Sequence, residues 1–222
     1  MSKNKVLVIV GAGPGIGMSI AKQFGMEGFS VALIARRLDK LFLYEKELRL
    51  AGIEAKGFPG DAASEVSLKT AIEAIVDTYG RIDVLHYNAA GKTSGSPIEL
   101  RMADAVRDFK ISVAGALVSV QECLPHMGND GAVLLTGGGF AYAPLAQYTS
   151  LSLGKAGIRN LAQSLHQELA PRGIYVGTLT ISGFVSPDTY YSPDRIAHSF
   201  YQMYCDRKET EIIFEEHSNS VH

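Results

Sequence analysis

The chain of 222 residues has little of what marks the special classes of protein. It contains only two cysteines, Cys123 and Cys205, which lie far apart and in no metal-binding spacing, so we expect reduced thiols and no metal site. No segment approaches the ~20 apolar residues of a membrane span. The N-terminal apolar run at 6–10 is too short for a secretory signal. These absences favour a cytoplasmic protein that does not bind membranes.

Charge of one sign is also scarce. The formal net charge is −2, which gives no electrostatic case for binding nucleic acid or an anionic membrane surface. The chain has no internal repeat, no linker and no low-complexity stretch. We therefore expect one domain spanning residues 1–222, with a polar, loose tail at 215–222.

Short apolar segments rich in β-branched residues alternate with longer segments whose apolar residues recur at three- and four-residue steps. The first kind predicts strands at 5–10, 30–35, 53–58, 82–87, 131–136, 174–181 and 211–214. The second kind predicts helices at 15–28, 38–52, 64–80, 102–127, 154–173 and near 192–204. Near-continuously apolar strands that alternate with helices indicate a parallel sheet covered on both faces. The expected fold is therefore α/β, a Rossmann-like doubly wound sheet of seven parallel strands.

The stretch VIVGAGPGIG ends the first predicted strand and opens the first helix, where a dinucleotide pyrophosphate binds in such folds. Its glycines follow the pattern G-x-x-x-G-x-G through Gly11, Gly15 and Gly17. Ile16 occupies the position where a G-x-G-x-x-G loop would have its third glycine. A tight strand–helix turn without a ligand has similar glycines, so the loop by itself leaves both interpretations open.

The end of the second predicted strand bears on which cofactor would bind. Folds that bind NAD commonly place an acid there for the ribose 2′-hydroxyl, but this chain has Ala35 followed by Arg36 and Arg37. An acid would repel a 2′-phosphate, whereas a guanidinium can bind one through two hydrogen bonds. Two solvated arginines at a helix start are the alternative. The pattern favours NADP(H) over NAD(H).

From residue 5 to about residue 185, these segments and others resemble the short-chain dehydrogenases/reductases, in the order of that family. GDAAS resembles the family's D-V-T segment, and HYNAAG resembles its N-N-A-G with Tyr87 and Ala90 substituted. ALVSVQECLPHM resembles the long helix that ends in L-P-x-M, and KAGIRNLAQSLHQELAPRGIYV resembles the family after its Y-x-x-x-K. The resemblance implies a cofactor site made of Gly11, Gly15, Ile16, Gly17, Arg36, Arg37, Asp61, Ala62, Asn88, Ala89, Lys155, Gly183 and Val185.

The family's chemistry is hydride transfer between a nicotinamide and a carbonyl or alcohol carbon. A tyrosine exchanges the proton, a lysine lowers the tyrosine pKa and holds the ribose, a serine binds the substrate oxygen and an asparagine supports a proton relay. The match implies that the lysine is Lys155, which puts Leu151 at the tyrosine position and Gly138 at the serine position. Ser112 stands at the asparagine position. Two of the four roles are therefore abolished and a third is altered.

Tyr148 is the candidate replacement for the missing acid. It lies three residues before Leu151 and seven before Lys155, so the three would share a face if the helix began early enough. Alternatively, Tyr148 belongs to the preceding loop, where it packs or lines the cleft, and we favour this interpretation. The segment between Gly183 and the helix near 192–204 is shorter than the family's lid, which would leave the cleft wetter.

Two functions are in competition. The first is an NADP(H)-dependent oxidoreductase acting on a small carbonyl or alcohol substrate, with Lys155, Ser112 and Tyr148 as candidate catalytic residues. The second is a non-catalytic NADP(H)-binding sensor or partner subunit. A purely structural oligomer subunit is disfavoured by the retained nucleotide motifs. The helices at 102–127 and 148–170 correspond to the pair through which the family associates, so we expect a homodimer or homotetramer.

Overall fold

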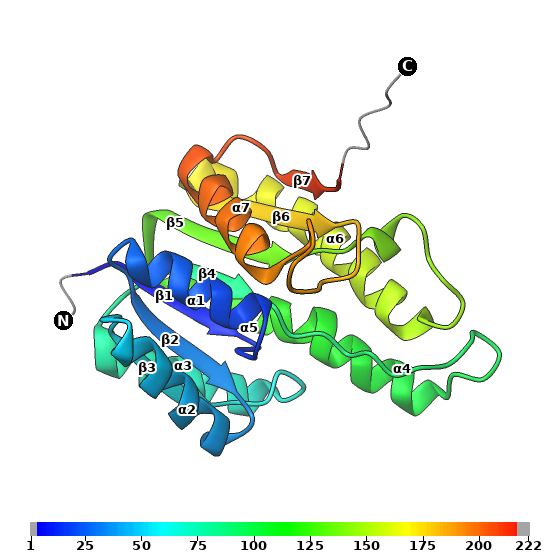
Figure 1. Ribbon diagram of the computed structural model, residues 1–222, viewed down its shortest axis with the longest axis horizontal. Coiled ribbons are helices and arrows are strands. Elements are labelled where there is room, and N and C mark those ends of the chain that lie inside the picture. Colours follow the sequence, from blue (N-terminus) through cyan, green and yellow to red (C-terminus); the bar gives the residue numbers. More distant parts are fainter. Residues whose placement is uncertain (1–3, 217–222) are drawn as a thin grey trace.

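All seven predicted strands are present in the computed structural model, which describes residues 4–216 (Figure 1). They form one sheet in the order β3-β2-β1-β4-β5-β6-β7, and each neighbouring pair is parallel. The strands are β1 (Val6–Val10), β2 (Ser30–Ala35), β3 (Ala55–Pro59), β4 (Ile82–Tyr87), β5 (Met127–Thr136), β6 (Tyr175–Ile181) and β7 (Glu211–Phe214). The predicted doubly wound fold is confirmed.

Helices cover both faces of the sheet, so the fold has three layers (Figure 1). The helices are α1 (Ile16–Met26), α2 (Leu38–Leu50), α3 (Glu65–Tyr79), α4 (Met102–Phe109), α5 (Gly115–Cys123), α6 (Thr149–Leu169) and α7 (Pro193–Asp206). α1, α2 and α7 pack on one face, and α3, α5 and α6 on the other. Two buried apolar clusters separated by the sheet explain why its strands are apolar on both sides.

Local sequence signals account for several helix ends. Ser64 caps α3, its hydroxyl accepting a hydrogen bond from the Ser67 amide, and Gly80 ends the helix in the left-handed conformation with φ of 78°. Pro193 occupies the first turn of α7, where a missing amide hydrogen costs nothing. One predicted boundary was wrong: β5 begins at Met127, earlier than the sequence pattern indicated. α6 matches the helix expected at 148–170, although its apolar periodicity was recognised only from residue 154.

The predicted helix at 102–127 is not continuous, because a π-helical turn, Lys110–Ala114, separates α4 from α5. The Tyr87 hydroxyl, at the end of β4, donates a hydrogen bond to the main-chain carbonyl of Ile111 within this turn. Gly115 makes room for that contact, since a Cβ there would lie 2.5 Å from the Tyr87 hydroxyl. Turns of this kind are frequent at functional sites, and this one carries Ser112.

The sheet reverses its strand order between β1 and β4, which are paired although far apart in sequence. In such sheets, ligands bind in the crevice at the carboxyl ends of the strands, at this switch point. Gly11, directly after β1, has φ of 88°, and a Cβ on it would lie 2.5 Å from the Ala89 amide nitrogen. Glycine is therefore required for the loops after β1 and β4 to meet.

Most of the predicted tail at 215–222 lies outside the described residues, because the structure describes the chain only to residue 216. Within the described part of the chain, no helix has the length and apolar character needed to cross a bilayer.

The start of the sheet depends on one buried carboxylate, and this gives a first prediction. Asp83, 4% exposed, accepts a 2.8 Å hydrogen bond from the Val6 amide and is ion-paired with Arg81. Asp83→Ala leaves a buried amide unpaired, so we expect the free energy of unfolding to fall by about 1–3 kcal/mol. Urea denaturation would measure it. The exposed Asp77→Ala on α3 is the control and should stay within about 0.5 kcal/mol of wild type; equal losses would contradict the prediction.

Candidate nucleotide-binding and active site

A cavity of about 460 Å³ opens at the carboxyl ends of β1, β2 and β4. It is lined by the predicted cofactor residues Gly11, Arg36, Arg37, Asp61, Ala62, Asn88 and Ala89. The sequence analysis missed other lining residues, among them Lys40, Tyr44, Lys92 and Ile111. A polar hollow of about 610 Å³ lies elsewhere, lined in part by Glu45, Arg49, Lys56 and Tyr79, and includes none of the predicted site residues.

The remaining predicted cofactor residues do not line this cavity. Gly15 has φ of 101° and caps the N-terminus of α1, while Ile16 packs partly buried against the core. Gly17 lies close to the turn, since a Cβ on it would be 3.2 Å from the Gly11 carbonyl oxygen. A Cβ on Gly13 would meet nothing within 4 Å, so space is open above the turn. An open glycine turn at a helix N-terminus suits a phosphate.

The second strand leads to the most positive part of the cavity. Arg36 is exposed, and within residues 4–216 its side chain makes no ion pair or hydrogen bond. Arg37 instead pairs with Asp39, with 2.6 Å between guanidinium nitrogen and carboxylate oxygen, and this pairing lowers the pKa of Asp39. Lys40 adds a further cation to the lining. Of the two predicted arginines, Arg36 is thus the one whose charge is not already paired.

Asp61 is held rigidly at the cavity wall. Its main-chain amide donates a 3.0 Å hydrogen bond to the Ser67 hydroxyl, and its Oδ1 accepts one of 3.0 Å from the Ala63 amide. Asp61 and Ala62 therefore form a fixed turn after β3, at the edge of the cavity where the family resemblance places the adenine.

Lys155 on α6 lies across Gly138. A Cβ on Gly138 would be 3.2 Å from both Cδ and Cε of the lysine, and the Lys155 Nζ donates a 2.7 Å hydrogen bond to the main-chain oxygen of Thr136. The residue as a whole is half-buried, and desolvation of its ammonium lowers its pKa to about 8. Glycine at 138 leaves Lys155 room over the end of β5, where a Cβ would make the lysine shift by a few tenths of an ångström.

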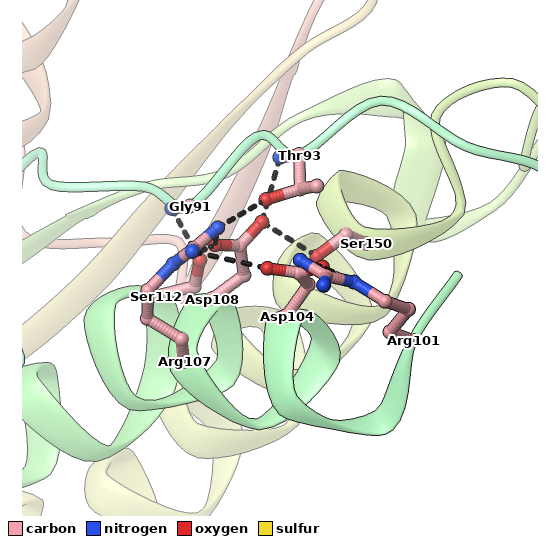
Figure 2. A network of polar contacts seen from close by, with 8 residues as sticks. All are labelled: Gly91, Thr93, Arg101, Asp104, Arg107, Asp108, Ser112 and Ser150. Atoms are coloured by element: carbon pink, nitrogen blue, oxygen red, sulfur yellow. Dashed lines mark hydrogen bonds and ion pairs between the residues drawn. The ribbon is translucent and has the colours of Figure 1, made fainter.

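Ser112 is committed to a structural contact. Its Oγ accepts a 2.9 Å hydrogen bond from the Gly91 amide, which holds the loop after β4 against the π-helical turn (Figure 2). It is 2% exposed and packs against Gly154 of α6, where a Cβ would approach its Oγ to 2.8 Å. In this arrangement, the Ser112 hydroxyl uses one of its lone pairs to fix the loop after β4.

Tyr148 is the residue just before α6 and not part of the helix. Its ring stacks on Phe140, with centroids 5.3 Å apart, and packs against Phe184 at 6.5 Å. Phe184 is 71% exposed. The structure thus agrees with the loop interpretation that the sequence favoured. These aromatic residues, which follow β5 and β6 and precede α6, form a wall that sequence spacing did not indicate.

A polar network around Asp108 ties three segments together (Figure 2). The carboxylate of Asp108 accepts hydrogen bonds from the Thr93 amide at 2.6 Å and the Ser150 hydroxyl at 2.8 Å. Arg107 contacts Asp108 at 3.3 Å and Asp104 at 3.0 Å. Burial alone would raise the pKa of Asp108, but the hydrogen bonds from Thr93 and Ser150 outweigh it and lower the pKa. The network joins the loop after β4 to α4 and to the start of α6.

This network was not predicted from the sequence. Asp104 and Asp108 lie one helical turn apart in a segment predicted to be helical, and both are almost fully buried. Two acids with the same i,i+4 spacing also occur on solvated helix faces, so the sequence pattern does not distinguish a buried network from an exposed pair.

The segment between β6 and α7 is short, as predicted, and is fastened by aromatic contacts. Tyr190 stacks on Phe214 at 4.9 Å and lies under the guanidinium of Arg195 at 4.3 Å. The Tyr191 ring packs on Gly183, and its hydroxyl accepts a 3.1 Å hydrogen bond from the amide of residue 216. The predicted cofactor residue Val185 is 43% exposed on this segment.

Beneath the cavity, a line of buried polar groups crosses the sheet from β4 to β5. The Thr136 hydroxyl lies 3.0 Å from His86 Nε2 and donates a 3.1 Å hydrogen bond to Asn88 Oδ1. Asn88 Nδ2 in turn donates to the Gly11 carbonyl at 3.2 Å. Burial, helped by the charge of Lys155, lowers the pKa of His86 to about 3. In residues 4–216, no group of three or more His, Cys, Asp or Glu is arranged to bind a metal ion.

A doubly wound parallel sheet with a glycine turn and a cavity at its switch point defines a Rossmann-type dinucleotide-binding protein. A family model described as short chain dehydrogenase matches residues 5–191. The chain belongs to this family of oxidoreductases, whose cofactor is a nicotinamide dinucleotide.

Individual relatives agree with this assignment. The chain is 32% identical over 189 residues to a putative ketoacyl reductase of Streptomyces coelicolor, covering 82% of this chain and 71% of that protein. It is 29% identical over 171 residues to tropinone reductase-like 3 of Erythroxylum coca, covering 76% of this chain and 66% of that protein. Among solved structures, a short chain dehydrogenase from Burkholderia cenocepacia in complex with NADP superimposes with a TM-score of 0.88 at 23% identity, covering 96% of each chain, which bears on the fold.

The buried His86 gives the second prediction, that the free energy of unfolding falls in acid. Its folded pKa of about 3 lies below the ordinary 6.5, so its contribution to stability is fully present above pH 6.5 and is lost as the pH falls toward 3. Between pH 7 and pH 5, this one group should remove about 2 kcal/mol from the free energy of unfolding. Urea denaturation at both pH values would measure the loss. His86→Leu should show a flatter pH dependence, and an equally steep one would contradict the assignment.

Proposed function

We propose that this protein binds NADP(H) in the cavity at the switch point. The observation that carries the proposal is the end of β2, where Ala35 stands in place of an acid and Arg36 offers an unpaired guanidinium to the cavity. A 2′-phosphate there would gain a charge-assisted contact and meet no repelling carboxylate at that strand end. The open space above Gly13 and the close packing of Gly11 against Ala89 fit a pyrophosphate beside the turn.

Each part of the site has a task in this proposal. The glycine turn and the N-terminus of α1 would hold the pyrophosphate, and Arg36 with Lys40 the 2′-phosphate. Asp61 and Ala62 would lie at the adenine, and Lys155, with the segment after β6, at the nicotinamide ribose. The nicotinamide supplies or accepts a hydride when bound. Support for NADP comes also from structural neighbours described as complexes with NADP or NADPH.

Ordinary carbonyl reduction is poorly served by the residues present. Leu151 has no proton to exchange, Gly138 has no hydroxyl, and Ser112 is occupied by the Gly91 amide. Tyr148 carries a hydroxyl with no hydrogen bond within the described chain, but its ring is stacked among aromatic neighbours in the loop before α6. We therefore propose an oxidoreductase fold with a degenerate catalytic site and slow turnover of small carbonyl or alcohol substrates.

The second candidate is a non-catalytic NADP(H)-binding sensor or partner subunit. It is favoured by the same observation that weakens catalysis: Lys155 leans over Gly138 onto the Thr136 carbonyl, where a catalytic serine would otherwise stand. Seven of the predicted cofactor residues meanwhile line the cavity. A site that keeps residues for the nucleotide but lacks the catalytic hydroxyls is expected to bind NADP(H) without efficient chemistry.

Association with a second copy and residence in the cytoplasm are further parts of the proposal. Large apolar side chains remain exposed on α4, α5 and α6, the helices that correspond to the family's associating pair. They are Met102, Val106, Phe109, Leu117 and Leu153. A homodimer or homotetramer would cover them, and no partner beyond a small molecule and further copies of the chain is invoked.

The third prediction tests the cofactor preference. Arg36→Ala removes one charge-assisted contact worth about 1.5–3 kcal/mol, so NADPH binding should weaken roughly ten- to a hundred-fold while NADH binding is spared. Fluorescence titration of both cofactors measures this. Arg37→Ala is the matched control, because Arg37 is already paired with Asp39, and its effect should be smaller. Equal losses for both cofactors in Arg36→Ala would count against a 2′-phosphate site.

The fourth prediction concerns the missing acid. The double variant Leu151→Tyr and Gly138→Ser should raise the rate of NADPH-dependent reduction of a simple ketone or aldehyde by about 10²-fold or more. A serine Cβ would come within 3.2 Å of the Lys155 stem, so the lysine must move by a few tenths of an ångström to accept the new side chain. NADPH oxidation across a carbonyl panel provides the measurement.

Two controls separate the candidate functions. Adding Lys155→Ala to the double variant should remove the gained activity, because the new tyrosine then lacks its positive neighbour. If the unmodified protein turns over rapidly and Tyr148→Phe abolishes that turnover, the degenerate-site proposal is wrong and Tyr148 is the acid.

A further inference from the structure

A chain of hydrogen bonds runs from His86 through Thr136 and Asn88 to Gly11, and the protonation of His86 determines which group donates in each bond. His86 is neutral and carries one ring proton, and its Nδ1 has no hydrogen-bond partner in the described chain. If the proton were on Nδ1, the Thr136 hydroxyl would have to donate to Nε2 and could not also donate to Asn88. Two groups, the buried Nδ1 hydrogen of His86 and the partly buried Oδ1 of Asn88, would then lack partners within the described chain. With the proton on Nε2, only one lone pair does, so this tautomer is favoured.

The tautomer fixes the orientation of the Asn88 amide. Nε2 of His86 donates to the Thr136 hydroxyl at 3.0 Å, and that hydroxyl must then donate to Asn88 Oδ1 at 3.1 Å. The Asn88 nitrogen consequently faces the Gly11 carbonyl, 3.2 Å away, which belongs to the glycine turn. His86 is fully buried with its ring against Phe200, and Thr136 is 6% exposed, so the contact between these two residues is shielded from water.

Thr136 also contacts the opposite side of the site. Its main-chain oxygen accepts the hydrogen bond from Lys155 Nζ at 2.7 Å. One residue at the end of β5 thus touches the lysine of α6 through its backbone and the loop after β4 through its side chain. No motif or spacing in the sequence assigns a role to Thr136 or His86.

We propose that Thr136, oriented by His86, is a positioning residue for the nucleotide site: it sets the Asn88 amide against the Gly11 carbonyl and so holds the glycine turn in its binding geometry. The proposal rests on the proposed NADP(H) binding. It adds two residues to the site that touch no nucleotide themselves and act through Asn88.

The test compares variants of similar size at two buried threonines. Thr136→Val keeps the shape and the main-chain oxygen but removes the hydroxyl, and Thr136→Ser restores it. Thr178→Val is the matched control, because Thr178 is equally buried on the adjacent strand β6 and its hydroxyl donates a 3.1 Å hydrogen bond to the Leu135 carbonyl, away from the cavity. The readouts are the NADPH dissociation constant and, without nucleotide, the NMR signal of the Asn88 side-chain amide, assigned by its loss in Asn88→Asp.

We expect Thr136→Val to raise the NADPH dissociation constant about tenfold, with Thr136→Ser and Thr178→Val within about twofold of wild type. The Asn88 amide protons should exchange faster with solvent in Thr136→Val than in wild type. Unchanged binding and exchange in a folded Thr136→Val, or equal weakening by Thr178→Val, would overturn the proposal. If Thr136→Val does not fold, Thr136→Ser decides: a loss of amide protection despite its hydroxyl contradicts the assignment, and retention supports it.

Wild-type protein that binds no NADPH would refute the proposed function instead. The exchange of the Asn88 amide would still report on Thr136 in that case, so the two failures are distinguishable.

Discussion

The site is built on the backbone contact between the loops that follow β1 and β4. A Cβ on Gly11 would come within 2.5 Å of the Ala89 nitrogen, so these loops touch at a distance that no other residue type permits. Asn88 reinforces the contact from its own side chain, and its main-chain amide donates to Val10 at 2.8 Å. Because β1 and β4 belong to the two halves of the doubly wound sheet, this contact fixes the position of the two walls of the cavity relative to each other.

On the side of the site formed by α6, Lys155 and Ser112 make contacts within the protein. With glycine at 138, the Lys155 stem lies over that residue and its ammonium donates a hydrogen bond to the Thr136 main-chain oxygen. The Ser112 hydroxyl accepts a hydrogen bond from the Gly91 amide of the loop after β4. Because these groups are packed and hydrogen-bonded to their neighbours, a substitution at one of them would disturb the others.

The fold could be predicted because its signals are local and redundant. Seven apolar runs, glycine at the helix ends and the turn after β1 each predict the same sheet. The cofactor residues stay a prediction from the family resemblance, and seven of them line the cavity. The π-helical turn was not predictable, because it depends on the Tyr87 hydroxyl reaching Ile111 across 24 residues of sequence. The roles of Asp108 and His86 were missed for the same reason: their partners come from separate elements, and their burial decides what they do.

The short segment between β6 and α7 is fastened to α7 and β7 by its own aromatic side chains. Tyr190 stacks on Phe214 of β7 and lies under the guanidinium of Arg195 of α7, and the ring of Tyr191 packs on Gly183. Mobile lids over active sites move on a microsecond-to-millisecond timescale and often limit turnover. For this segment to act as such a lid, the aromatic contacts of both tyrosines would have to break each time it moved.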